Sequence, residues 1–163
     1  MTSLDTARTL AIAVPAALLA GAYGSEIWGG LYPCEMCWWQ RYAHFAALGL
    51  ALLSFLLVKA PDRGRSFVWL AALAILVSGG IGAYHAGVEA GVFEGFTTCT
   101  STGTAGLSAE DMLKEIMAKP MVRCDDIQFS FLGVSMAGWN AILSILAALS
   151  ILWLSLRRPR ASA

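Results

Sequence analysis

Charged side chains are scarce in this chain of 163 residues, since they account for 13% of it while apolar side chains account for 58%. The mean hydropathy is +0.66. An ordinary soluble domain carries about 25% charged residues, so this composition excludes that class. The length leaves no room for a separate soluble domain, and we expect a single membrane domain over residues 1–163.

Charge is almost absent from four long apolar runs, at about residues 10–28, 38–58, 67–88 and 136–156. Each run can cross a hydrocarbon layer about 30 Å thick, which takes about 20 helical residues. Helices are expected because a lone strand in lipid would leave its backbone unpaired. The sequence therefore predicts an all-α membrane protein. It is a bundle of four transmembrane helices, with loops at about 29–37 and 89–135.

Basic residues are distributed unevenly between the two sides of these spans, with seven on one side against four on the other. The side richer in lysine and arginine is normally cytoplasmic. Acidic residues show the opposite bias, with two against nine. We therefore expect both termini in the cytoplasm and both loops on the outer side. Arg157, Arg158 and Arg160 fit a cytoplasmic tail, so no nucleic-acid partner is needed to explain them.

The first apolar run has a second interpretation, as a cleaved signal peptide. Arg8, the run itself and Ala20-Gly21-Ala22 resemble the parts of such a segment. Two features favour a retained helix: the apolar character continues to Trp28, and Pro15 interrupts the core of the run.

Cysteine is also rare, and none of the four lies within an apolar run. Cys34 and Cys37 fall in the first outer loop, whereas Cys99 and Cys124 fall in the second. Disulfides persist on the non-cytoplasmic side of a membrane. Two cysteines in each outer loop are the arrangement expected of thiols that exchange with one another.

The Cys34–Cys37 pair has the spacing of a reversible disulfide and immediately precedes the second apolar run. A helix N-terminus there would favour a thiolate. Arg41 follows Cys37 by one helical turn and lies on the same face. Its cation could stabilise a Cys37 thiolate or the charge that develops on a bound electron acceptor.

Other interpretations of these residues remain open. The four cysteines could form a zinc site, although such sites usually contain a second close pair, and Cys99 and Cys124 are far apart in sequence. Cys99 and Cys124 could form a purely structural disulfide. Arg41 could be an interfacial residue that extends its charge to the membrane surface.

Three segments together resemble the DsbB family of disulfide bond formation proteins. The first is Leu31–Arg41, LYPCEMCWWQR; the second is Arg123–Asp125 followed by Phe131–Asn140, FLGVSMAGWN; the third is Tyr84–Glu89, YHAGVE. The match extends to the four spans, the order of the loops and all four cysteines. The CxxC pair alone would be a weak signal, but the combination is specific.

This resemblance implies a relay of thiol–disulfide exchange in a bacterial inner membrane. A reduced oxidase of the DsbA type would attack Cys99, and the released Cys124 would attack Cys34. Cys37 would then be freed beside Arg41 and would deliver electrons to a quinone, either ubiquinone or menaquinone. The DsbA–DsbB–quinone chain is known to keep the bacterial periplasm oxidising. No structural metal is expected.

Two histidines are further candidates for contacts with the quinone. The resemblance implies that His85 lies beside the quinone ring and donates a hydrogen bond or a proton to it. Without the resemblance, His85 would be interpreted as an interfacial residue packed on Tyr84. His44, three residues after Arg41, has the same two interpretations.

Three classes of function remain, and the quinone-coupled thiol oxidase leads them, either general or dedicated to one substrate. The second is a quinone or epoxide reductase of the vitamin K type. It would be supported by a serine or threonine one turn before the CxxC and by a fused thioredoxin-like domain. The third is a membrane protein that only carries structural disulfides or zinc.

Overall fold

The structure is a computed structural model that describes residues 2–95, 108, 110 and 122–157. Four long helices run alongside one another in this part of the chain: α1 (Ser3–Gly29), α2 (Glu35–Leu56), α3 (Arg65–Glu89) and α5 (Met136–Leu156). A short antiparallel hairpin of β1 (Ser130–Phe131) and β2 (Val134–Ser135) leads into α5. The helical bundle is confirmed, and the hairpin is an addition that the sequence did not predict.

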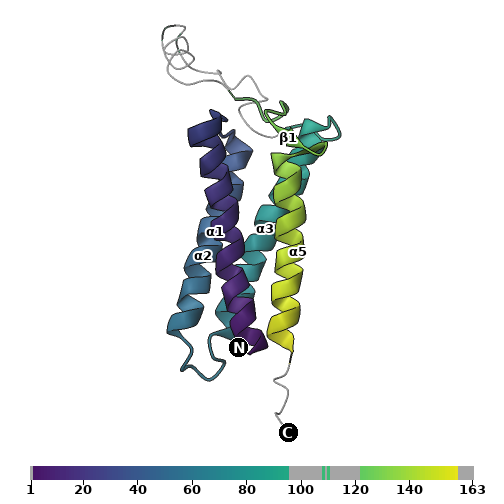
Figure 1. Ribbon diagram of the computed structural model, residues 1–163. Coiled ribbons are helices and arrows are strands. Elements are labelled where there is room, and N and C mark those ends of the chain that lie inside the picture. The colour runs from purple at the N-terminus through teal and green to yellow at the C-terminus, as the bar shows by residue number, and fades with distance from the viewer. Residues whose placement is uncertain (1, 96–107, 109, 111–121, 158–163) are drawn as a thin grey trace.

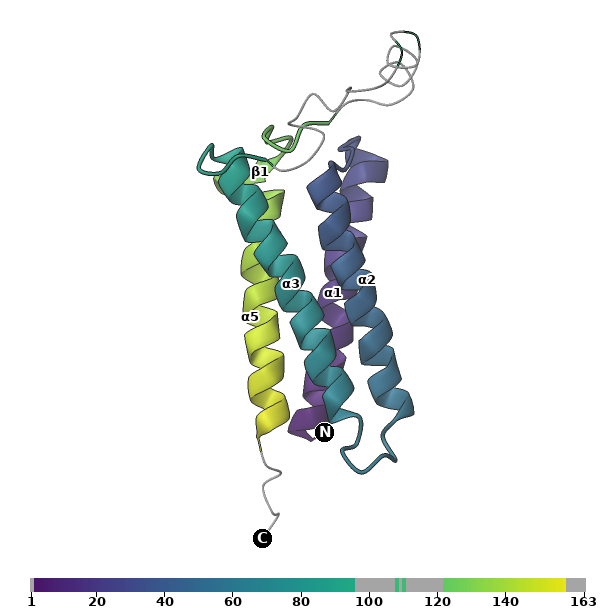
Figure 2. The same cartoon turned by 180° about the vertical axis from the view of Figure 1, so that it is seen from behind.

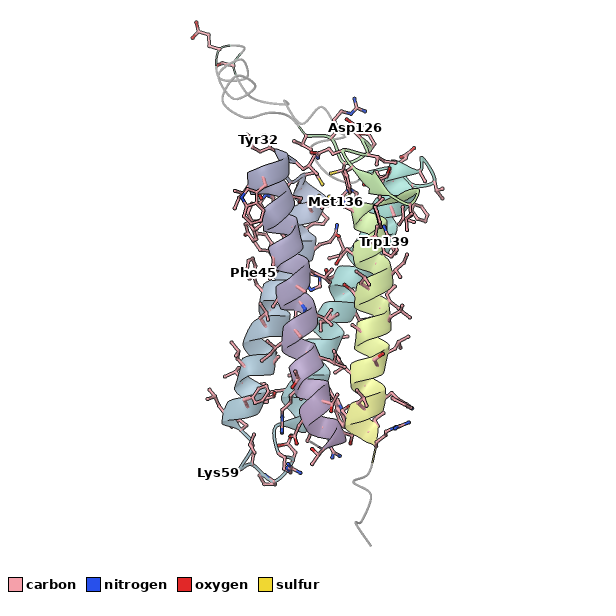
Figure 3. The ribbon with its side chains drawn as sticks, viewed as in Figure 1. Tyr32, Phe45, Lys59, Asp126, Met136 and Trp139 are labelled. Carbon is pink, nitrogen blue, oxygen red and sulfur yellow. The ribbon has the colours of Figure 1, made fainter. Side chains whose placement is uncertain are left out.

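The bundle has two distinct ends. The start of α1, the end of α5 and the α2–α3 connection share one end, while the α1–α2 connection and β1 lie at the other (Figures 1 and 2). With side chains drawn, Lys59 lies at the first end, and Tyr32, Asp126 and Met136 lie at the second (Figure 3). The CxxC loop and the segment that leads into α5 therefore meet at one end of the bundle.

Three of the four long helices among the described residues are long and apolar enough to cross a membrane, namely α1, α3 and α5. The fourth, α2, has 22 residues, but its first turns contain Gln40, Arg41 and His44. These polar side chains lower the mean hydropathy of the helix. The role of α2 as a fourth span therefore stays a prediction.

Large and small apolar residues occupy different places in the bundle. The interior contains many alanines together with Val68, Ile75 and Ile151. Large side chains such as Phe55, Leu73, Leu146 and Leu149 are exposed on the outside. Small interior residues let helices approach closely, which is how membrane helices pack when lipid is as apolar as their own side chains. This distribution suits a bundle surrounded by lipid.

The helices α3 and α5 approach each other closely at Gly82. A Cβ atom added at Gly82 would lie 2.9 Å from the carbonyl oxygen of Ala137 and 3.1 Å from the amide nitrogen of Ala141. Only glycine fits such a contact without a shift of the backbone. The approach brings the outer half of α3, including His85, beside the start of α5.

Local caps determine where the helices begin and end near the CxxC loop. Gly30, in the left-handed region with φ of +66°, ends α1. The side chain of Cys34 caps α2 by accepting a hydrogen bond from the amide of Cys37, and Ser135 caps α5 in the same way through Gly138. A residue that caps a helix has a constrained side chain. The sulfur of Cys34 is therefore held at the N-terminus of α2.

Candidate redox site

The CxxC pair forms the centre of the site. Cys34 and Cys37 are thiols with sulfur atoms 2.7 Å apart, and the Cys37 amide donates to the Cys34 sulfur over 3.3 Å. The first turn of α2 brings the two sulfurs together because residues three apart on a helix are neighbours. The predicted redox spacing thus corresponds to a real pair of adjacent sulfurs.

Cys124 belongs to the same cluster although it is 90 residues from Cys34 in sequence. It is fully buried and packs with Cys34, Met36 and Val88. Its side chain is hydrogen-bonded with that of Cys34. Cys34 therefore contacts a sulfur from each of two loops, Cys37 in the first and Cys124 in the second.

The two sulfurs of the CxxC pair differ in acidity. Contact with Cys34 holds the pKa of Cys37 below its usual value, because a thiol can donate to a neighbouring thiolate. Contact with the Cys124 side chain, the contact with Cys37 and burial all raise the pKa of Cys34. As the pH rises, Cys37 therefore loses its proton before Cys34 does. The thiolate is the reactive form of a cysteine.

His85 extends from α3 to the cysteine cluster. Its Nε2 atom lies 3.2 Å from the backbone carbonyl oxygen of Cys124, 3.7 Å from the sulfur of Cys34 and 3.8 Å from Glu89 Oε1. The imidazole is buried, with 4% of its surface exposed. The hydroxyl of Ser135, the cap of α5, donates to the other oxygen of Glu89. His85 is therefore placed against both cysteine-bearing loops at once.

A chain of amide side chains connects His85 to the interior of the bundle. Gln40 Nε2 lies 3.1 Å from His85 Nδ1, and Gln40 Oε1 accepts from Asn140 Nδ2 over 2.7 Å. Asn140 Oδ1 lies 2.9 Å from His44 Nε2, which also lies 2.9 Å from the hydroxyl of Ser78. Buried polar groups that satisfy one another in this way hold their side chains in defined positions.

Arg41 is buried and paired. Its Nη1 lies 2.6 Å from Glu26 Oε2, and its Nη2 donates to the carbonyl oxygen of Ala22 over 3.2 Å. The guanidinium also lies over the rings of Tyr23 and Trp38, at 4.5 and 5.0 Å from their centroids. Glu26 offsets part of this positive charge. Arg41 lowers the pKa of Cys37, but it is a smaller influence than the contact with Cys34.

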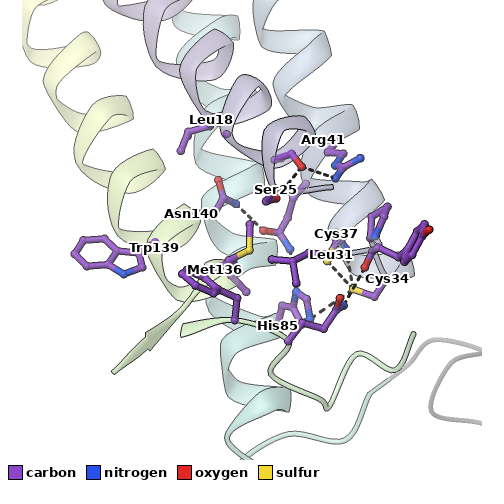
Figure 4. A pocket seen from close by; sticks show the side chains of 18 of the residues that line it. Leu18, Ser25, Leu31, Cys34, Cys37, Arg41, His85, Met136, Trp139 and Asn140 are labelled. Atoms are coloured by element: carbon purple, nitrogen blue, oxygen red, sulfur yellow. Dashed lines mark hydrogen bonds between the residues drawn. The ribbon is translucent and has the colours of Figure 1, made fainter. Parts of the chain in front are cut away.

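A cavity of about 740 Å³ opens beside these residues. Small-molecule sites typically measure about 300–1,000 Å³ and combine apolar walls with a few polar groups. Apolar residues of α1 such as Leu18 and Leu19 line one side, and Cys34, Cys37, Arg41, His44 and His85 all reach it. Figure 4 shows Cys37, Arg41, Asn140 and His85 arranged around this space. The cavity can thus take a small molecule directly beside the cysteine pair.

The cluster also has a geometry that could suit a metal ion. The ligand atoms of Cys34, Cys37 and His85 lie within 4.8 Å of one another. Zinc is commonly held by thiolate and imidazole ligands, with imidazole binding through an unprotonated nitrogen. Whether His85 can be such a ligand depends on which ring nitrogen carries the proton.

Comparison with known proteins assigns the chain to a family. The model of the family "Disulfide bond formation protein DsbB" matches residues 5–154. The chain belongs to the DsbB family. It is 30% identical to disulfide bond formation protein B of Marinobacter nauticus over 91% of this chain and 90% of that protein. For the protein of the same name from Paracidovorax citrulli, identity is 32%, over 96% and 92%. No solved structure gives a significant match.

DsbB membership confirms the resemblance seen in the sequence. Proteins of this family are membrane thiol–disulfide oxidoreductases that take part in disulfide bond formation, and this chain is one of them. The structure brings Cys34, Cys37 and Cys124 together, and Arg41, His44 and His85 line one cavity. Cys99 lies outside the described residues. The individual roles of these residues stay predictions.

Two residues of this DsbB-family site were not singled out from sequence. Gln40 and Asn140 lie inside the segments that resemble the family, but no chemistry was assigned to them. Both are amides within expected spans, where an uncharged polar side chain must find a partner. That signal marks them as members of a buried network, although it does not identify their partners.

Proposed function

We propose that this protein reoxidises a DsbA-type periplasmic thiol oxidase and passes the electrons to a membrane quinone. One observation carries the proposal: the sulfur of Cys34 contacts both Cys37 and Cys124, and the pair borders a cavity in an apolar bundle. A shared sulfur next to an acceptor site is what a disulfide relay requires.

The orientation proposed is that of a multi-pass inner-membrane protein with α2 as the fourth span. Lys59 lies at the end of the bundle opposite the CxxC loop (Figure 3), and the start of α1, which contains Arg8, shares that end (Figure 1). An excess of lysine and arginine favours the cytoplasm. Both termini are then cytoplasmic, and the cysteines face the periplasm, where disulfides persist.

The exchange between the two loops is proposed to use Cys34 as the common sulfur. A thiolate at Cys124 attacks Cys34 of the Cys34–Cys37 disulfide, a Cys34–Cys124 bond forms, and Cys37 leaves with the electron pair. The low pKa of Cys37 supports this direction because a more acidic thiol leaves faster. Cys99 is proposed as the sulfur that the DsbA-type partner attacks.

The residues around the cavity fit a quinone, either ubiquinone or menaquinone. A quinone supplies an acceptor for two electrons and two protons. Apolar side chains of α1 suit an apolar ring, while Arg41 and His85, which also line the cavity, provide hydrogen-bond donors for carbonyl oxygens. In addition, His44 Nδ1 is buried without a hydrogen-bond partner among the described residues. Arg41, His44 and His85 are proposed to orient the ring.

The proposal is tested by mixing the purified, detergent-solubilised protein with a reduced DsbA-type partner and a short-chain ubiquinone. Quinone absorbance is followed for the original protein and for Cys34→Ser and Cys99→Ser. Ser150→Ala, an exposed position on the outside of α5 whose hydroxyl bonds only to its own helix, is the control for substitution in general.

Loss of quinone that requires both cysteines and survives Ser150→Ala supports the relay. No loss with either ubiquinone or menaquinone, in protein that still elutes as a folded species, contradicts it. Such a result would leave the cysteines with a structural role.

A further inference from the structure

The buried amide chain determines which nitrogen of His85 carries its proton. The Nε2 group of Gln40 donates to the backbone carbonyl oxygen of Met36 over 3.2 Å. Asn140 Nδ2 donates to the backbone carbonyl oxygen of Ser78, also over 3.2 Å. A backbone carbonyl only accepts hydrogen bonds, so each amide is fixed with its NH₂ group on that side. Neither amide can be flipped without losing this bond.

With the amides fixed, the Gln40 NH₂ group faces His85 Nδ1 at 3.1 Å. Two donors cannot face each other, so Nδ1 is unprotonated and accepts from Gln40. The remaining ring proton is on Nε2. The groups around Nε2 agree with this, because the carbonyl oxygen of Cys124 and the carboxyl oxygen of Glu89 are both acceptors.

We propose that Gln40 and Asn140 are positioning residues that hold His85 as its Nε2–H tautomer, so that the ring donates its proton toward the sulfur of Cys34. This inference deepens the proposed function, on which it rests. It assigns His85 to the thiol exchange in addition to the quinone contact that family resemblance implies.

The chemical use of this donor follows from the position of Cys34 in the relay. When an incoming thiolate attacks Cys124 of a Cys34–Cys124 disulfide, a new bond forms at Cys124 and Cys34 leaves with the electron pair. The Nε2–H group, 3.7 Å from the Cys34 sulfur, can hydrogen-bond to that departing thiolate. No proton is transferred in this step, and the imidazole remains neutral.

The same tautomer argues against zinc at this cluster. A nitrogen that carries a proton has no lone pair for a metal, and moving the proton to Nδ1 would oppose the Gln40 donor. Of the three residues whose ligand atoms lie close together, only Cys34 and Cys37 could then bind the metal ion.

The tautomer is tested by nitrogen-15 NMR of protein labelled at its two histidines, in detergent and without quinone. Signals that disappear in His85→Phe are assigned to His85. The original protein should show an unprotonated Nδ1 and a protonated Nε2. In Gln40→Glu, which replaces the donor by an acceptor of the same shape, a proton should appear on Nδ1. Ser144→Ala, which removes a buried hydroxyl at the far side of Asn140, is the matched control and should change nothing at His85.

The effect on Cys34 is tested by its alkylation rate with iodoacetamide in a Cys37→Ser background, again without quinone. A hydrogen bond to a charged group shifts such an equilibrium by about tenfold or more. His85→Phe should therefore slow alkylation at neutral pH by about tenfold.

A protonated Nδ1 in the original protein would overturn the inference, as would unchanged Cys34 alkylation in folded His85→Phe. A shift of Nε2 when Zn²⁺ alone is added to the reduced protein would also overturn it. None of these measurements contains quinone, so failure of quinone reduction with these results intact would count against the proposed function only.

Discussion

The ion pair between Glu26 and Arg41 makes a quantitative prediction about Cys37. Cys37 and Arg41 are four residues apart on α2, a spacing at which Cβ atoms lie about 6 Å apart. At that distance, the interaction between two unit charges is about 3 kcal/mol at an effective dielectric constant of about 20 and about 0.7 kcal/mol in water. Arg41 is 6% exposed and the Glu26 side chain 25%, so an intermediate value of about 1 kcal/mol is expected. One pKa unit corresponds to about 1.4 kcal/mol.

Removal of either partner should therefore shift the pKa of Cys37 in opposite directions. Glu26→Gln exposes Cys37 to an uncompensated cation and should lower its pKa by about 0.5 to 1 unit, whereas Arg41→Met should raise it by a similar amount. The double variant should return close to the original value because the pair is removed as a whole.

The assay is site-resolved alkylation of the reduced protein as a function of pH, with Cys37 quantified by mass spectrometry of its peptide. Below the pKa, a shift of 0.5 to 1 unit changes the thiolate fraction by about three- to tenfold. A shift in the same direction for both single variants, or no shift in either, would refute the view that the charges of this pair act on Cys37.

Two further predictions concern the scaffold. Gly82→Ala should lower the free energy of unfolding by about 1–3 kcal/mol, because its Cβ would press on Ala137 and on the Asn140 amide. Thermal unfolding in detergent should show this loss of stability. Gly80→Ala, whose Cβ meets nothing within 4 Å, is the control. Asp62 accepts hydrogen bonds from Ser66 and Gly64, which lower its pKa to about 2. The ionised Asp62 therefore stabilises the start of α3 fully above about pH 4, and this stabilisation should be lost as the pH falls through about 2. Amide exchange at Ser66 should follow that titration, and Asp62→Ala should abolish the pH dependence.

The bundle could be predicted from the sequence because its signals are local. Apolar runs of about 20 residues and their boundaries need no tertiary information, and residues 136–156 coincide with α5. The helices α1 and α3 extend beyond the expected spans because capping residues, Thr2 for α1 and Gly64 for α3, begin them further out.

The site was only partly predictable because it depends on how the helices are rotated about their axes. Spacing placed Cys37 and Arg41 on one face of α2, and the structure agrees. It could not show that Arg41 turns toward Glu26, nor that Gln40 meets His85 on one side and Asn140 on the other. Those contacts join α2 to α1, α3 and α5 across long sequence separations. They arise from packing, for example the close approach at Gly82.

The most direct test of the account is the disulfide that forms when Cys37 is removed. Cys37→Ser protein is oxidised mildly in detergent, digested without reduction and mapped by mass spectrometry. Because the Cys34 side chain contacts that of Cys124, the account predicts a Cys34–Cys124 disulfide with Cys99 left as a thiol. A Cys99–Cys124 disulfide with Cys34 left reduced would contradict the claim that Cys34 is the sulfur shared by the two loops.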